Sequence, residues 1–144
     1  KWFFGLKYKK NFKTLLTDGG HNQDALIALS EFINNNNLYP FTLILGMASD
    51  KLNENLRAPL KKLCKNADTI ILTSVHSQRS ANPELLESFL NNSGAMENLP
   101  AIKLSDSAEY ALKISLTNPN KPIVVAGSFY LVGNIMRLLS IGTE

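Results

Sequence analysis

One cluster of polar residues, Asp18-Gly19-Gly20-His21-Asn22, has the types and spacing needed to bind a ligand. The two glycines let the backbone turn sharply and approach a bound molecule closely. A carboxylate such as Asp18 accepts hydrogen bonds from a ribose diol, and the His21 side chain donates to an anionic group. The same residues also suit a tight turn between a strand and a helix, with Asn22 as the N-cap and Asp18 bonded to loop amides.

A second candidate, Gly127-Ser128, follows an apolar run and precedes a stretch with helical spacing. Backbone N–H groups and the helix dipole favour an anion at such a helix start, and the Ser128 hydroxyl adds a donor. A plain N-cap serine is the simpler alternative. The local sequence Gly-Ser-Phe differs from the Gly-x-Ser-x-Gly turn of α/β-hydrolases, which argues against a serine hydrolase.

Weaker candidates follow two other apolar runs. Arg79 lies among serine and glutamine residues. A guanidinium there either forms two parallel hydrogen bonds with a substrate carboxylate or is simply solvated. His76 is a poorer candidate, and Asp50-Lys51 favours a surface ion pair or a helix start. The chain contains neither the Gly-x-x-x-x-Gly-Lys-Ser/Thr pattern of a P-loop nor the Gly-x-Gly-x-x-Gly dinucleotide fingerprint.

The elements that position these residues alternate along the chain. Apolar and β-branched runs predict strands at residues 12–17, 41–47, 68–74, 102–104 and 122–126, with an extra strand at 2–8 in a hairpin with the first. Helical spacing predicts helices at residues 22–34, 53–65, 82–90, 105–116 and 128–139. Pro59 conflicts with the second helix, so we expect a kink or a late start there. Ser105 resembles a capping residue for the fourth helix.

This alternation predicts a parallel sheet in an α/β fold, since strands that alternate with helices form βαβ units. The strands are apolar on both faces, which indicates a three-layer, Rossmann-like sandwich with helices on both sides of a mostly parallel sheet of about six strands. The N-terminal strand is expected at an antiparallel edge, and residues 1–144 form one domain. Ligands bind beyond the carboxyl ends of such strands, so Asp18, His21, Arg79 and Ser128 are expected at one edge of the sheet.

Composition excludes several classes of protein. With 44% hydrophobic residues in 144, the chain is long enough to build its own core. One cysteine, Cys64, excludes an intramolecular disulfide, and with two histidines it makes a zinc site improbable, so no metal ligands are assigned. No apolar run approaches the roughly 20 residues that span a bilayer, and no signal peptide is recognisable. We expect a cytoplasmic protein without a membrane partner.

The net charge of +3 has a local origin. Five lysines and no acidic residue occur in the first thirteen residues, whereas the rest of the chain has ten basic and twelve acidic residues. A basic terminal stretch is usually a solvated hairpin, and no aromatic RNA-binding signature accompanies it. We therefore expect no nucleic-acid partner.

Three segments of the chain resemble motifs of the folylpolyglutamate synthases and dihydrofolate synthases, which belong to the Mur ligase superfamily. The segment Asp18-Gly-Gly-His-Asn22 resembles their Asp-Gly-Gly/Ala-His-Asn motif, and Gly46-Met with Asp50-Lys51 resembles Gly-Met-x-x-Asp-Lys. The segment Gly127-Ser-Phe-Tyr-Leu-Val-Gly133 resembles Gly-Ser-Leu-Tyr-Leu-Val/Ala-Gly. The motifs occur in the family's order over nearly the whole chain. Cell-wall Mur ligases lack the last motif, so the resemblance favours the folate branch.

The resemblance implies the C-terminal domain of an ATP-dependent ligase that adds L-glutamate to dihydropteroate or a reduced folate through an acyl phosphate. It implies that Asp18, Gly19, Gly20 and Asn22 bind ATP, with Asp18 on the ribose. It places His21 and Ser128 at the incoming glutamate as catalytic residues, and Arg79 on a glutamate carboxylate. These assignments remain expectations at this stage.

The same resemblance implies partners beyond these 144 residues. Family members carry an N-terminal ATPase domain that holds the P-loop and most of the Mg²⁺ ligands, so ATP and Mg²⁺ are the expected cofactors and the fragment alone is expected to be inactive. Two alternatives stay open: a non-catalytic α/β module that binds a nucleotide or an acidic ligand, and the C-terminal domain of a cell-wall Mur ligase.

Overall fold

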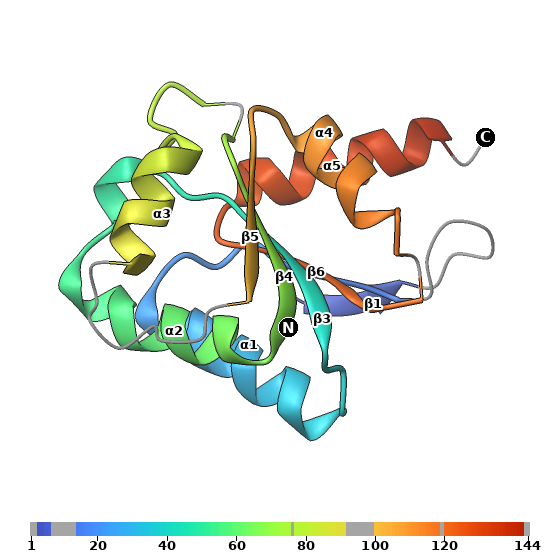
Figure 1. Ribbon diagram of the computed structural model, residues 1–144, viewed down its shortest axis with the longest axis horizontal. Helices are drawn as coiled ribbons and strands as arrows, with labels where there is room; N and C mark the ends of the chain where they lie inside the picture. Colours follow the sequence, from blue (N-terminus) through green and yellow to red (C-terminus); the bar gives the residue numbers. More distant parts are fainter. Residues whose placement is uncertain (1–2, 7–13, 76, 92–99, 119, 143–144) are drawn as a thin grey trace.

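The computed structural model describes residues 3–6, 14–75, 77–91, 100–118 and 120–142. His76 and the five N-terminal lysines lie outside the described residues. Within the described part, a six-stranded sheet has the order β1-β2-β6-β3-β4-β5 (Figure 1). Its strands are β1 (Phe3–Leu6), β2 (Leu15–Asp18), β3 (Phe41–Leu45), β4 (Ala67–Thr73), β5 (Ala101–Ser105) and β6 (Ile123–Ala126). Strand β1 pairs antiparallel with β2, and the other neighbours are parallel, which confirms the predicted sheet and its antiparallel edge.

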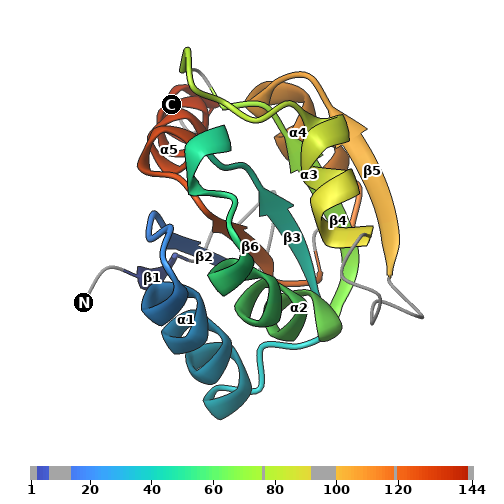
Figure 2. The same ribbon diagram turned by 90° about the vertical axis from the view of Figure 1, so that its left-hand side faces the viewer.

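Helices cover both faces of the sheet, as predicted. They are α1 (Gln23–Asn35), α2 (Arg57–Lys65), α3 (Pro83–Asn91), α4 (Ala108–Ser115) and α5 (Phe129–Gly142), with short 3₁₀ turns η1 (Ser49–Lys51) and η2 (Glu54–Leu56). Figures 1 and 2 show α1 and α2 on one side of the sheet and α4 and α5 on the other. None of the helices in the described residues combines the length and apolar character needed to span a bilayer.

The alternating side chains of the central strands divide the core into two layers. In β3, Leu43 and Leu45 pack with residues of α1, α2 and α3, whereas Ile44 faces the layer formed with α4 and α5. Strand β6 repeats the alternation, with Val124 on the first side and Val125 on the second. All of these side chains are fully buried, and both layers are built from residues of this chain. Apolar burial of this extent is the main favourable contribution to folding.

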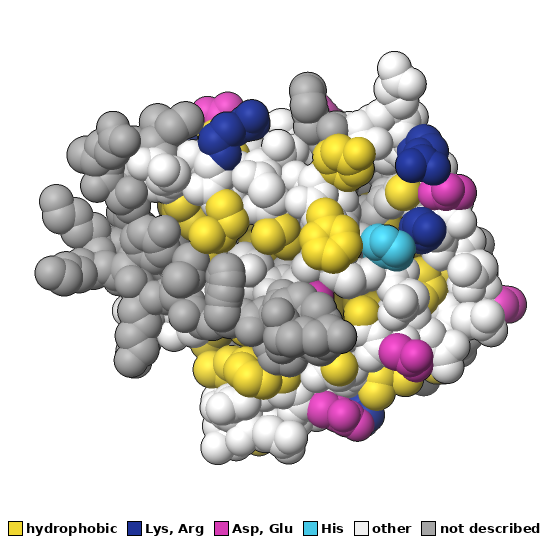
Figure 3. Space-filling model, turned by 180° about the vertical axis from the view of Figure 1, so that it is seen from behind, with side chains coloured by type: hydrophobic (Ala, Val, Ile, Leu, Met, Phe, Trp, Pro, Cys, Tyr) yellow, Lys and Arg dark blue, Asp and Glu magenta, His cyan; other side chains and the backbone are white. Residues whose placement is uncertain are grey.

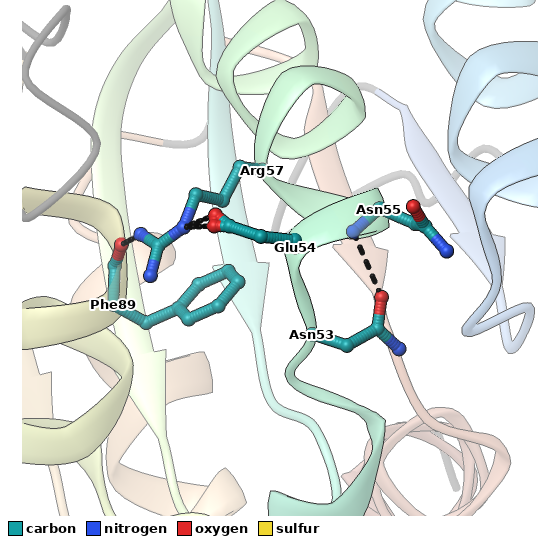
Figure 4. A network of polar contacts seen from close by, with 5 residues as sticks. All are labelled: Asn53, Glu54, Asn55, Arg57 and Phe89. Atoms are coloured by element: carbon teal, nitrogen blue, oxygen red, sulfur yellow. Dashed lines mark hydrogen bonds and ion pairs between the residues drawn. The ribbon is translucent and has the colours of Figure 1, made fainter.

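The second predicted helix begins later than its apolar spacing indicates. Residues 53–65 divide into η2 and α2, and Pro59 falls in the first turn of α2, where its missing N–H costs no helical hydrogen bond. At this junction, Arg57 Nε donates to Glu54 Oε1 at 2.5 Å, and Arg57 Nη1 donates to the Phe89 carbonyl at 2.6 Å (Figure 4). The Arg57 guanidinium also lies 4.3 Å from the centre of the Phe89 ring, so it ties the start of α2 to α3.

The predicted N-cap of the fourth helix was wrong by two residues. Ser107, not Ser105, is the N-cap of α4, and its hydroxyl accepts from the Tyr110 N–H. Ser105 ends β5, and its buried hydroxyl donates to the Ser107 carbonyl at 2.7 Å. Strand β5 therefore runs one residue beyond the predicted strand end at 104, and α4 begins at Ala108, three residues later than predicted.

Candidate functional site

The parallel register brings the ends of three strands together at one edge of the sheet. Asp18, the last residue of β2, lies beside Ala126 of β6, which in turn lies beside Leu45 of β3. The loops that leave these strands therefore start from neighbouring positions, as the rule for open parallel sheets predicts. The loop after β4 begins one strand further along the same edge, because Leu45 pairs with Leu72.

Asp18 is buried at the start of its loop, with 2% of its surface exposed. Its Oδ1 accepts a hydrogen bond from the Gly20 N–H at 2.8 Å, and its buried Oδ2 has no hydrogen-bond partner among the described residues. Burial raises the pKa of the Asp18 carboxyl because the charged form loses solvation, and the Gly20 N–H opposes this by lowering it. The Asp18 carboxyl group therefore takes part in the hydrogen bonding of its own loop, and in this conformation it is not open to a ligand.

Close packing explains the glycine that follows Asp18. A Cβ atom added to Gly19 would lie 2.2 Å from Cδ1 of Phe129, so the aromatic ring rests directly on the Gly19 backbone. At the end of the loop, Asn22 is the N-cap of α1, and its Oδ1 accepts from the Ala25 N–H at 2.9 Å. The loop from Gly19 to Asn22 is thus fixed at both ends.

Gly127 and Ser128 form the sharp turn between β6 and α5. Gly127 has φ +104°, and a Cβ there would lie 2.4 Å from the Gly46 carbonyl oxygen, so both its backbone and its surroundings require glycine. The Ser128 hydroxyl accepts from the N–H groups of Tyr130 at 3.1 Å and Leu131 at 3.3 Å. Ser128 is therefore a helix cap, and its hydroxyl hydrogen remains available to donate to a ligand.

His21 lies opposite the start of α5. Its ring and that of Phe129 make an edge-on contact, with centroids 6.3 Å apart and planes at 87°. The His21 Nδ1 atom is buried and has no hydrogen-bond partner in the described part of the chain. The edge-on contact with Phe129 is therefore one interaction that holds this imidazole in place.

The loops after β3 and β4 are joined through their backbones. Ser49 N–H donates to the Arg79 carbonyl at 2.7 Å, and Ala81 N–H donates to the Met47 carbonyl at 2.8 Å. On the outer side, Arg79 Nη1 and Asp50 Oδ2 form an ion pair at 3.4 Å, with 73% and 50% of their side chains exposed. The backbone of these loops is fixed, whereas the charged side chains stay open to solvent.

His21, Arg79 and Ser128 meet in one cleft of about 110 Å³. The cleft is also lined by Ala48, Asp50, Lys51, Gly127, Phe129 and Tyr130. Figure 3 shows this side of the molecule, with hydrophobic side chains beside a histidine and basic and acidic side chains beyond it. Three of the four predicted site residues are thus brought together, and Asp18 lies at the same sheet edge, buried within its loop.

Comparison with known proteins decides the family. The model of the dihydrofolate synthetase C-terminal domain matches residues 5–138 of the chain. The chain belongs to this family. Among its curated relatives are a probable dihydrofolate synthetase of Schizosaccharomyces pombe, 26% identical over 133 residues, and a folylpolyglutamate synthase of Lacticaseibacillus casei, 30% identical over 126 residues. The matches cover 88% and 87% of this chain but 31% and 27% of the two relatives, so the chain spans about a third of their length or less.

Solved structures show the same fold as this dihydrofolate synthetase-type C-terminal domain. The E. coli FolC structure in complex with DHPP and ADP superposes with a TM-score of 0.75 at 19% identity, over 96% of this chain and 31% of that one. A bifunctional folylpolyglutamate synthase/dihydrofolate synthase from Yersinia pestis, complexed with AMPPNP and Mn ion, superposes with a TM-score of 0.71 at 21% identity, over 88% and 28%.

The structure adds residues to the site of this dihydrofolate synthetase-type domain that the sequence did not single out. Phe129 and Tyr130 line the cleft although 63% of each side chain is exposed. Lys51, for which the sequence favoured a surface ion pair or a helix start, lines it as well. The available signal was the position of Phe129 and Tyr130 directly after Gly127-Ser128, but apolar spacing assigns such residues to the core.

The charges around the cleft favour an anionic ligand. Lys51, Arg79 and the N-terminus of α5 supply positive potential, against the single exposed carboxylate of Asp50. Among the described residues, no three His, Cys, Asp or Glu side chains form a group that could hold a metal ion. The cleft therefore suits the recognition of carboxylate or phosphate groups by side chains and backbone N–H groups.

Proposed function

We propose that residues 1–144 are the single glutamate-ligase-type C-terminal domain of a cytoplasmic, ATP-dependent dihydrofolate synthase or folylpolyglutamate synthase. One observation carries the proposal: the family match over residues 5–138 comes with a cleft onto which all three family-like segments converge. His21, Asp50 with Lys51, and Ser128 come from those three segments and line the same cleft. An N-terminal ATPase domain would complete the enzyme, because the matches cover 31% and 27% of the relatives, which are more than three times as long as the matched segments.

The proposed reaction joins L-glutamate to the carboxylate of dihydropteroate or a reduced folate. The substrate carboxylate displaces ADP from the γ-phosphorus of ATP, which gives an acyl phosphate. The glutamate amine then attacks the acyl carbon, phosphate leaves, and an amide remains once the amine has lost a proton. This domain would contribute binding and orientation at the carboxyl edge of the sheet, where proximity of two bound reactants lowers the barrier.

The proposed roles in glutamate binding follow the cleft. Ser128 would donate its free hydroxyl hydrogen to a glutamate carboxylate at the start of α5, where backbone N–H groups favour an anion. Arg79 would bind a carboxylate through its exposed guanidinium, exchanging its partner Asp50 for the ligand. His21 would lie beside the incoming amine, and we assign it and Ser128 as the catalytic residues of this domain.

The proposed nucleotide site is the loop of Asp18, Gly19, Gly20 and Asn22, with the Asp18 carboxylate on the ribose. Since Asp18 is buried, this role requires the loop to open when the nucleotide binds. No three His, Cys, Asp or Glu side chains form a possible Mg²⁺ site among the described residues, so we place the Mg²⁺ ligands mainly in the proposed ATPase domain.

The deciding experiment is an assay of the full-length protein with ATP, L-glutamate and either dihydropteroate or tetrahydrofolate, monitored for the amide product. Product with the first acceptor indicates dihydrofolate synthase, product with the second indicates folylpolyglutamate synthase, and product with both indicates a bifunctional enzyme. The 144-residue chain alone serves as the control and should neither hydrolyse ATP nor form an amide. No product with either acceptor would favour a non-catalytic binding module.

A further inference from the structure

We infer that Phe129 is a positioning residue that holds the His21 imidazole in its orientation within the cleft. The structural part of this inference stands on contacts of the described residues. Its kinetic consequence rests on the proposed function, because it assumes that His21 acts on glutamate.

Phe129 lies at an exposed position, outside the hydrophobic core. It is the first residue of α5, directly after the Ser128 cap, and 63% of its side chain is exposed. A large aromatic side chain at such a position gains little from burial. Its ring nevertheless has a defined neighbour, because three ring atoms lie 2.2–2.8 Å from the position that a Gly19 Cβ would occupy. The absence of a side chain at Gly19 makes room for the ring.

The His21 imidazole has an aromatic contact and one buried nitrogen without a described hydrogen-bond partner. The two rings meet edge-on at 6.3 Å, and the Nδ1 atom of His21 is buried without a hydrogen-bond partner in the described part of the chain. The residues on either side are fixed by other interactions, since Gly20 N–H donates to Asp18 and Asn22 caps α1. The loop backbone therefore has hydrogen-bonded anchors in addition to the packing of Phe129 on Gly19, and these anchors remain when the Phe129 ring is removed.

Tyr130 provides an internal comparison. It follows Phe129 directly, has the same 63% exposure and lines the same cleft. Within the described residues, no ring contact joins it to His21. Phe129 and Tyr130 therefore share their exposure and their position in the cleft and differ in the ring contact with His21.

The family-like motif contains leucine where this chain has Phe129. Leucine fills part of the space over Gly19 but cannot make an edge-on contact with an imidazole. A Phe129→Leu variant therefore separates the packing of the loop from the orientation of His21. Phe129→Tyr keeps the ring and is the conservative variant that should restore the contact.

The first measurement follows the ring resonances of the two histidines by NMR in the 144-residue chain. His21→Gln assigns the His21 signals. We expect Phe129→Leu to move the His21 signals, and Phe129→Tyr and Tyr130→Ala to move them much less. Unmoved His21 signals in Phe129→Leu, or an equal movement in Tyr130→Ala, would overturn the inference. Thermal unfolding of each variant confirms that it is folded.

The second measurement is steady-state kinetics of the full-length protein. An edge-on aromatic contact corresponds to roughly a two- to tenfold effect, so Phe129→Leu should raise the KM for glutamate by that factor and leave the KM for ATP unchanged. Phe129→Tyr should restore the wild-type KM. An active enzyme whose KM for glutamate is unaffected by Phe129→Leu contradicts the inference. A protein without ligase activity contradicts the proposed function instead, and the NMR result then decides the positioning role alone.

Discussion

The two sides of the cleft are built in different ways. On one side, the loop after β2 and the start of α5 are fixed by close packing, with Phe129 on Gly19 and the Gly46 carbonyl against Gly127. On the other side, the loops after β3 and β4 are fixed by hydrogen bonds between their backbones, and the side chains of Asp50 and Arg79 are free to change partners. Substitutions on the packed side therefore alter fold and site together, whereas substitutions on the hydrogen-bonded side report on ligand binding alone.

The two acidic residues of the cleft region show the same contrast. Asp18 is 2% exposed and accepts a backbone N–H, so its charge is part of the folded loop. Asp50 is half exposed and pairs with Arg79, an arrangement worth little to stability because solvent screens it.

Gly127→Ala should have the largest effect. A Cβ there would lie 2.4 Å from the Gly46 carbonyl oxygen, and the backbone has φ +104°, so the substitution adds a clash to a strained conformation. We expect a loss of about 3 kcal/mol in the free energy of unfolding, measured by chemical denaturation of the chain. A loss below about 1 kcal/mol, less than backbone strain alone predicts, would show that the turn can relax and that this side is not fixed by packing.

Gly133→Ala is the matched control in the same helix. A Cβ at Gly133 meets nothing within 4 Å. The residue lies in the middle of α5, away from both helix ends, and is exposed to solvent. Alanine is a better helix former than glycine, so the variant should gain about 0.8 kcal/mol. Opposite signs at two glycines of one motif would separate the demands of the turn from those of the helix.

The sequence predicted the sheet and its edge because strong local patterns specify them. Strands β3 and β6 are apolar at nearly every position, whereas a strand with one exposed face alternates apolar and polar residues. This indicates that helices cover both faces of the sheet. The ends of those strands then locate the cleft. The role of Phe129 could not be predicted in this way, because it depends on a contact with Gly19, far away in the sequence. The burial of Asp18 was missed for a similar reason, since the polarity of a residue does not reveal what covers it.

Ser128 has two separable roles, and two variants distinguish them. Ser128→Ala removes the cap of α5 and should lower the free energy of unfolding by about 1 kcal/mol. It should also raise the KM for glutamate about tenfold, since hydrogen bonds to charged groups contribute roughly 1.5–3 kcal/mol. Ser128→Asp keeps a capping oxygen but places a negative charge at the anion site.

We therefore expect Ser128→Asp to retain the stability of the wild type while losing glutamate binding in the full-length enzyme. The KM for ATP should barely change in either variant, whereas Asp18→Ala should weaken ATP use more than glutamate use. Equal effects of Ser128→Ala on both substrates would mean that Ser128 only shapes the turn.

Asp18→Asn tests the buried charge through its pH dependence. Burial raises the pKa of this carboxyl above its ordinary value of 3.8, so the folded chain binds the proton more tightly than the unfolded chain. The free energy of unfolding of the wild type should therefore fall as the pH rises from 3.8 through the folded pKa, and the amide variant should lack this fall. Denaturation at pH 4 and pH 7 measures it, with Asp50→Asn as the exposed control. A variant less stable than the wild type at pH 7 by a margin that grows with pH would show that the Gly20 N–H outweighs desolvation.

Arg79→Ala should have the smallest effect on stability and a large effect on binding. Its ion pair with Asp50 is exposed, so the free energy of unfolding should change by less than about 0.5 kcal/mol. If the guanidinium binds a glutamate carboxylate, the KM for glutamate in the full-length enzyme should rise about tenfold or more. Arg79→Lys keeps the positive charge but lacks the planar guanidinium, so its KM for glutamate should lie between those of the wild type and Arg79→Ala.

Asp50→Asn removes the ion-pair partner of Arg79, so it should leave the KM for glutamate unchanged or lower it. A KM for glutamate unaffected by Arg79→Ala would identify Arg79 as a solvated side chain and confine recognition to the packed side of the cleft, because nothing else about the fold changes in this variant.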